Sequence, residues 1–178
     1  MTGAIIEVPS VDILVDEDLQ DVDIAVEQLQ KYRELLSQSL QSNETFVTYA
    51  DLLKERDICV RVCSEGVSQQ FNQEFRGKNK PTNILSFVSS QDLPADVQQQ
   101  LPLGDLLICW PVLVAEAQAQ QKSIEDHVSH LFIHGCLHLL GFDHEGEQEA
   151  MQMEAIEIEV LAQLDIANPY VSSSQPYV

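Results

Sequence analysis

The fold is organised around the stretch His130-Leu-Phe-Ile-His134-Gly-Cys-Leu-His138-Leu-Leu-Gly141-Phe-Asp-His144, in a chain of 178 residues. Its apolar residues continue a run that starts at Val128. Upstream, Ser123 followed by Asp126 three residues later is typical of a helix N-terminus. Gly141 suits the left-handed conformation that commonly ends a helix. We therefore expect a mostly buried helix from Ser123 to Gly141.

Three histidines of this stretch are spaced for binding one ion. His134 and His138 are four residues apart, so they share a helix face with imidazoles about 6 Å apart along the axis. A chain reversal at Gly141 would bring His144 to the same side. Three neutral imidazoles with one open position form the ligand set of a catalytic zinc. A single buried histidine is usually a hydrogen-bonded core residue, but the combined spacing predicts a metal site on this helix and the following loop.

Other side chains of the same helix are expected to have packing, supporting or surface roles. Cys136 lies about 200° around the helix from His134, which predicts that it packs into the core. His127 and His130 lie on the His134 face, one or two turns earlier. Supporting or surface roles are expected for both, and direct ligation by His130 is the alternative.

The histidine spacing equals that of the metzincin peptidases, HExxHxxGxxH, but Gly135 stands where those enzymes have glutamate. That glutamate is the general base that takes a proton from the metal-bound water. Glycine cannot do this, so peptide hydrolysis is disfavoured, with a base such as Asp143 or Glu145 as the open alternative. Hydrolysis of another substrate stays open, since a metal alone lowers the pKa of its water to about 7.

The charge distribution points to one segment for phosphate contacts. The net charge is −20, with 29 acidic residues against 9 Lys and Arg, which argues against loose adhesion to nucleic acid or anionic lipid. Three of the cations lie close together, at Arg76, Lys78 and Lys80. A guanidinium fork suits the charge that a phosphodiester gains in its transition state, so Arg76 is the best candidate. Its alternative role is a surface salt bridge.

Other sequence features argue against a membrane-spanning protein, a secreted protein and a cysteine metal site. The longest apolar stretch, residues 106–115, is well short of the roughly 20 residues that span a bilayer, and it contains Pro111. The N-terminus lacks the features of a secretory signal, which predicts a cytoplasmic protein with reduced thiols. The four cysteines offer no CxxC spacing, so a cysteine metal site is not expected: Cys59, Cys63, Cys109 and Cys136.

Strand and helix patterns alternate along the chain. Strands are expected at 11–15, 58–63, 84–88 and 106–109, and helices at 22–41, 67–75, 112–121, 123–141 and 147–164. A Gly- and Pro-containing loop is expected at 76–83, and a polar, turn-like segment at 91–102. The pattern predicts an α/β (α+β) fold, in which one domain over residues 1–168 has a small mixed sheet packed with helices. Residues 169–178 are expected to be a frayed tail.

Three blocks in this order resemble the YbeY family of bacterial endoribonucleases. They are Phe71-Asn-Gln-Glu-Phe-Arg-Gly-Lys-Asn-Lys-Pro-Thr-Asn-Ile-Leu-Ser-Phe87, Leu103-Gly-Asp-Leu-Leu-Ile-Cys109, and His134 to His144. The resemblance covers about residues 58–170, whereas the acidic first fifty residues match less well.

The resemblance implies a zinc-dependent endoribonuclease that cuts single-stranded RNA, in 16S rRNA 3′-end maturation and ribosome quality control. By position, it implies His134, His138 and His144 as metal ligands, and Arg76 with His134 as the catalytic residues. Residues 81–83, with Gly104 and Asp105, would support the cleft. The implied partners are ribosomal RNA in the small subunit, a small-subunit ribosomal protein and an assembly GTPase. A metzincin-like peptidase and a non-catalytic assembly factor with a structural metal are the alternatives.

Overall fold

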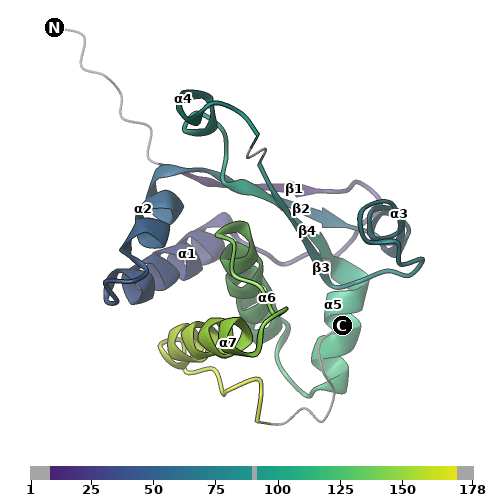
Figure 1. The fold of residues 1–178 in the computed structure, drawn as a ribbon. Helices are drawn as coiled ribbons and strands as arrows, with labels where there is room; N and C mark the ends of the chain where they lie inside the picture. The colour runs from purple at the N-terminus through teal and green to yellow at the C-terminus, as the bar shows by residue number, and fades with distance from the viewer. Residues whose placement is uncertain (1–8, 90–91, 172–178) are drawn as a thin grey trace, which may run out of the picture.

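The computed structural model describes residues 9–89 and 92–171, and its centre is a four-stranded sheet (Figure 1). The strand order is β1-β2-β4-β3, with β1, β2 and β4 parallel and β3 antiparallel at the edge. The expected mixed sheet is confirmed, and its last strand begins two residues earlier than predicted. The strands are β1 (Val11–Val15), β2 (Ile58–Cys63), β3 (Ile84–Val88) and β4 (Gly104–Cys109).

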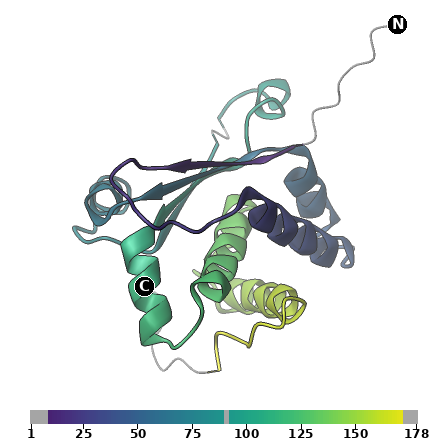
Figure 2. The ribbon, with the colours of Figure 1, turned by 180° about the vertical axis from the view of Figure 1, so that it is seen from behind.

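Seven helices accompany the sheet in the described part of the chain. Figures 1 and 2 show α1, α6 and α7 gathered on one side of the strands, with α4 standing apart on the loop between β3 and β4. The helices are α1 (Val26–Gln41), α2 (Val47–Glu55), α3 (Glu65–Arg76), α4 (Ala95–Gln98), α5 (Trp110–Ala119), α6 (Ile124–Leu139) and α7 (Glu147–Ala162).

Alternating side chains of the strands build two separate cores, because successive residues of a strand point to opposite faces. On β4, Leu106 and Ile108 join the large core beside Phe132 of α6. Leu107 joins a smaller core on the other face, which α3 covers with partly buried side chains such as Phe71. The sheet therefore separates α3 from the helix that carries the histidines.

The first helix and α5 begin at residues other than those predicted, for local reasons. The first helix begins at Val26 and not at residue 22, because the backbone is still extended at Ala25, with φ of −94° and ψ of 138°. Helix α5 begins at Trp110, directly after β4, with Pro111 in its first turn. Proline is tolerated there, since its missing N–H would have no partner in the helix.

The segments around these helices also hold elements that the sequence patterns did not predict. Helix α2, which buries Ala50 and Leu53, was not expected at all. A single helical turn, α4, forms within the segment expected to be turn-like. Helix α3 extends to Arg76 and ends at Gly77, whose φ is +67°. Arg76 is therefore the last helical residue, and the predicted loop begins one residue later.

Helix α6 lies directly against the sheet at Gly135. A Cβ atom built there would lie 2.8 Å from both Ile84 Cδ1 and Leu106 Cδ2, too close for any side chain without movement of the core. At Gly104 on β4, a Cβ atom would lie 2.3 Å from the carbonyl oxygen of Phe87. The two glycines let the helix and the edge strand approach the sheet closely.

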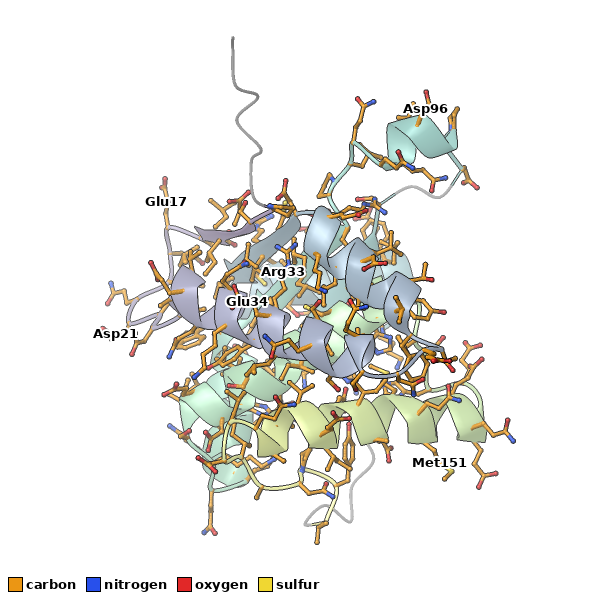
Figure 3. All side chains as sticks on the ribbon, turned by 90° about the vertical axis from the view of Figure 1, so that its left-hand side faces the viewer. Glu17, Asp21, Arg33, Glu34, Asp96 and Met151 are labelled. Carbon is orange, nitrogen blue, oxygen red and sulfur yellow. The ribbon has the colours of Figure 1, made fainter. Side chains whose placement is uncertain are left out.

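Most acidic side chains lie at the periphery. Figure 3 shows Glu17, Asp21 and Asp96 projecting outward, while Arg33 of α1 is 3% exposed. The Arg33 guanidinium donates to backbone carbonyl oxygens, including that of Leu53 over 2.7 Å. All four cysteines are free thiols. None of the described helices is both long and apolar enough to cross a bilayer.

Candidate metal centre

Both ends of α6 have the structure that their sequence predicts. The Ser123 hydroxyl accepts a hydrogen bond from the Asp126 amide over 3.0 Å. At the other end Gly141 has a φ of +96°, and the Phe142 amide donates to the Leu137 carbonyl over 3.0 Å. This is the left-handed helix stop in which the chain folds back over the last turn. The residues after Gly141 consequently return alongside the helix.

Three imidazole rings meet where α6 joins this loop. The Nε2 atoms of His134 and His138 are 3.2 Å apart. The ring centre of His144 lies 5.0 Å from that of His134 and 4.9 Å from that of His138. One nitrogen from each ring lies within 4.8 Å of the other two, so a single ion can contact all three. The structure thus brings together the three histidines that the sequence singled out.

Hydrogen bonds orient two of the rings for an ion. His134 Nδ1 lies 2.7 Å from Glu157 Oε1, and His138 Nδ1 lies 2.9 Å from the carbonyl oxygen of Phe142. An ionised carboxylate and a carbonyl only accept, so both Nδ1 atoms carry the proton and both Nε2 atoms keep a lone pair. A metal needs this tautomer, and the donor set therefore fits a divalent cation.

The buried carboxylate of Glu157 on α7 organises the site. It is 0% exposed, bonds to His134, lies 3.6 Å from His130 Nε2, and accepts a hydrogen bond from the Tyr170 hydroxyl. Burial opposes ionisation, but the hydrogen bonds from His130 and His134 outweigh it and lower the pKa of Glu157 to about 2. The group therefore stays anionic and balances part of a bound cation's charge.

Sequence reasoning missed Glu157, although one signal was present. The acid lies within the buried stripe of α7, where the other members are apolar: Met153, Ile156, Val160 and Leu161. An acid in such a stripe is rarely fully buried unless it is paired. Its partner lies 23 residues away on another helix, so the pairing itself is a tertiary contact.

The first residues of the expected tail are held in the structure. Pro169 is buried, the Tyr170 amide donates to Asn168 Oδ1 over 2.8 Å, and the Tyr170 hydroxyl donates to Glu157. The rest of the predicted tail, residues 172–178, lies outside the described residues. The segment after α7 thus reaches back to the histidine cluster.

The other two histidines of α6 are buried, so a surface role is wrong for both. His127 Nε2 lies 2.8 Å from Glu116 Oε2, and Asn83 Nδ2 donates to the same carboxylate. His130 lies against Glu157 and is not one of the three clustered histidines. Cys136 is 0% exposed in the core, as predicted.

Gly135, which stands where metzincins have a glutamate, packs directly against the sheet. Because Gly135 is in contact distance of Ile84 and Leu106, a glutamate there would push into the core rather than reach an ion. Asp143 uses Oδ1 to accept a hydrogen bond from the His144 amide, which stabilises the loop. Within the described residues, no hydrogen bond or ion pair joins Glu145 to the three rings. The peptidase alternative therefore gains no support from this geometry.

Arg76 lies at the exposed C-terminal end of α3. Its side chain forms no hydrogen bond or ion pair with any described residue, so the predicted alternative of a surface salt bridge finds no partner there. The following loop is fixed by Thr82, whose carbonyl accepts from the Ser68 hydroxyl over 2.8 Å. Asn83 then ties the start of β3 to Glu116 of α5.

Replacing Glu157 with glutamine is expected to weaken metal binding by about 10- to 100-fold, because the His134 ring loses an anionic partner that orients it and raises its basicity. The affinity can be measured by competition against a chromophoric chelator. Glu159→Gln, an exposed change on the same helix, is the matched control. An affinity in Glu157→Gln equal to that of the wild type would show that the carboxylate does not act on the site.

Acid should destabilise the metal-free protein through His138. Burial, followed by the neighbouring His134 and His144, lowers the pKa of His138 from 6.5 to about 4. The folded state therefore binds fewer protons than the unfolded state, and this contribution to stability is lost as the pH falls from about 6.5 to about 4. Urea unfolding at pH 7 and pH 5 should show a smaller loss for His138→Gln than for wild type, whereas equal losses would contradict the shift.

Comparisons with known proteins agree with this geometry. Residues 15–165 match the family model described as "Endoribonuclease YbeY", a range that includes much of the acidic N-terminal segment. A solved structure from Thermotoga maritima has a TM-score of 0.50 and 23% identity over 92% of this chain and 97% of that one, which supports the fold.

Curated relatives named endoribonuclease YbeY are more similar in sequence. The protein of Pseudoalteromonas translucida is 46% identical over 74% of this chain and 88% of its own length. The protein of Francisella tularensis subsp. mediasiatica is 49% identical over 67% of this chain and 74% of its own, and that of Acinetobacter baumannii is 45% identical over 76% and 95%. With the family match spanning most of the sequence and three histidines converging on one point, the chain belongs to the YbeY endoribonuclease family.

Proposed function

We propose that this protein is a metal-dependent, single-strand-specific endoribonuclease that acts in 16S rRNA 3′-end maturation and ribosome quality control. The observation that carries the proposal is the cluster of His134, His138 and His144, with its imidazole nitrogens oriented toward one point. The relatives' name supplies the class of substrate, and the cluster supplies the place where its chemistry would occur. We infer a cytoplasmic location from this role.

Zinc is the ion we propose for the site. In tetrahedral zinc sites the Zn–N distance is about 2.0–2.1 Å, which places two ligand nitrogens about 3.3 Å apart. The 3.2 Å between the Nε2 atoms of His134 and His138 agrees with that value. When bound, the ion supplies a Lewis acid beside the scissile phosphodiester and an open position for a reactant.

The chain's own residues hold and orient the reacting groups. His134 takes its orientation from Glu157, and His138 takes its own from the Phe142 carbonyl. These bonds fix the rings in advance, so little reorganisation is needed when charge develops. Arg76 is proposed to pair with a non-bridging phosphate oxygen, since its guanidinium is exposed and has no partner among the described residues.

A partner is proposed to deliver the RNA. A net charge of −20 opposes tight binding of a free polyanion, so activity on naked RNA should be weak and sensitive to salt. We propose ribosomal RNA within the small subunit as the substrate, with a small-subunit ribosomal protein and an assembly GTPase as helpers. An affinity for free RNA that stayed tight at high salt would contradict this part of the proposal.

Cleavage of defined RNAs tests the activity. The zinc-loaded protein should cut a single-stranded RNA and leave the matching duplex intact, and a chelator should stop the reaction. Product ends identify the nucleophile: a cyclic phosphate implies the ribose hydroxyl, and a linear phosphate with no cyclic precursor implies water. Failure of the zinc-loaded protein to cut either free RNA or immature small subunits would favour an assembly factor with a structural metal.

A further inference from the structure

An exposed aromatic ring lies beside the cation cluster. Phe75 of α3 is 57% exposed, although its ring packs on two others. It stacks on Phe71 with ring centres 5.8 Å apart and an interplanar angle of 23°, and it forms a T-shaped contact with Phe87 with ring centres 5.1 Å apart. The two supporting rings hold Phe75 in place while more than half of its surface stays open to solvent.

The cations next to this ring are exposed and available. Arg76, Lys78 and Lys80 have no hydrogen bond or ion pair from their side chains to any described residue. By contrast, Arg61 is paired with Asp16 at 2.8 Å, and the remaining two arginines donate to backbone carbonyls: Arg33 and Arg56. In a chain with a charge of −20, this segment offers a polyanion three exposed positive charges within five residues.

The cation loop is held in a defined shape. The buried Asn72 side chain donates to the Lys80 carbonyl over 2.7 Å, and the Lys78 amide donates to the Asn72 carbonyl over 3.2 Å. Gln69 Nε2 donates to Asn79 Oδ1 over 2.8 Å. Three links to α3 therefore fix the backbone that carries the lysines. A loop ordered in advance loses less entropy when a ligand binds.

Strand β3 connects this surface to the metal centre. The Phe87 ring contacts Phe75 on one face of the strand. The adjacent residue, Ser86, points to the other face and donates to the carbonyl of Gly135, the residue after His134, over 3.5 Å. Neighbouring Cα atoms are about 3.8 Å apart, so only the edge strand separates the aromatic cluster from the histidine helix. A strand of nucleic acid that crosses this edge could meet both.

We propose that Phe75 is a stacking platform for one base of a single-stranded RNA, with Lys78 and Lys80 beside Arg76 contacting the flanking phosphates. Every base has a π face, so such a platform binds without strong sequence preference. A surface of rings and cations without acidic partners matches a nucleic-acid strand better than an apolar protein contact. The inference rests on the proposed endoribonuclease function, because it assigns a substrate contact of that reaction.

Binding of a 2′-O-methyl oligoribonucleotide tests the platform. The probe carries 2-aminopurine at successive positions, and zinc-loaded protein is titrated while a gel confirms that the probe stays intact. Stacking on Phe75 should quench one position. Phe75→Leu should abolish that quenching and weaken binding by about 5- to 100-fold, whereas Phe75→Trp should retain both. Leu14→Ala, which changes an exposed apolar residue on β1, should bind as the wild type does.

Two further readouts separate stacking from charge. An abasic site at the quenched position should weaken wild-type binding as much as Phe75→Leu does, with little further loss when the two are combined. The slope of the logarithm of the binding constant against the logarithm of the salt concentration should be unchanged in Phe75→Leu. In Lys78→Gln its magnitude should fall by about 0.7. Melting temperatures check that each variant is folded.

Unchanged affinity of Phe75→Leu for the probe would overturn the platform. Unchanged affinity together with weaker binding to purified small subunits would also overturn it, because the ring would then contact a feature of the subunit and not a single strand of RNA. Cleavage of single-stranded RNA by the wild type is measured in parallel. If the wild type cuts RNA while Phe75→Leu binds normally, only the platform is wrong; if the wild type does not cut RNA, the proposed function fails regardless of Phe75.

Discussion

Replacing His138 with alanine is expected to abolish stable metal binding and to slow RNA cleavage by about 10³-fold or more. The change removes one of the three proposed imidazole ligands and leaves the His134 nitrogen without its neighbour at 3.2 Å. A bound ion contributes several kcal/mol of charge stabilisation in the transition state, and each 1.36 kcal/mol corresponds to about tenfold in rate. Metal content by elemental analysis and single-turnover cleavage of a single-stranded RNA measure the two effects.

A second histidine of α6 provides the matched control. His127→Gln keeps a side chain that can bond to Glu116, two turns before the cluster, and should retain both metal and activity. Urea unfolding of His138→Ala identifies a purely structural role for the ion. If His138→Ala loses its metal and stability but cuts RNA at the wild-type rate, the metal serves folding, and the enzymatic proposal is wrong.

Replacing Arg76 with alanine is expected to slow cleavage by about 10²- to 10³-fold while leaving metal content and melting temperature unchanged. Under the proposal that Arg76 donates to the reacting phosphate, loss of that one donor has an effect of this size. Arg76 is exposed at the last turn of α3 and forms no hydrogen bond or ion pair with a described residue, so its removal should not disturb the fold. Single-turnover rates at saturating enzyme separate this effect from weaker binding.

Arg76→Lys should recover part of the rate, because lysine keeps the charge but loses the planar fork. Lys54→Ala removes an exposed cation on α2 and controls for the change in net charge. A wild-type rate at saturation for Arg76→Ala would restrict Arg76 to binding. A wild-type rate at all enzyme concentrations would show that Arg76 takes no part in the reaction, and would favour the assembly-factor alternative.

The histidine cluster was predictable because its geometry is local. Four-residue spacing sets His134 and His138 on one face of any α-helix, and Gly141 permits the left-handed stop that returns His144. The four strands were also predictable from β-branched and apolar runs. In contrast, α2 lacked a clear start signal, and the first helix began later because the backbone is still extended at Ala25.

The remaining features depend on contacts between distant segments. Glu157 and Tyr170 join the site only because α7 and the segment after it pack against α6, and no local pattern specifies that approach. The sheet also determines why position 135 carries no side chain.

The sequence alone thus determined which three rings can share an ion, since backbone geometry within about twenty residues is enough for that. Only the tertiary structure decided which carboxylate orients His134 and which aromatic surface lies across the edge strand. The physical reason is that burial and long-range packing, not local conformation, bring those groups together.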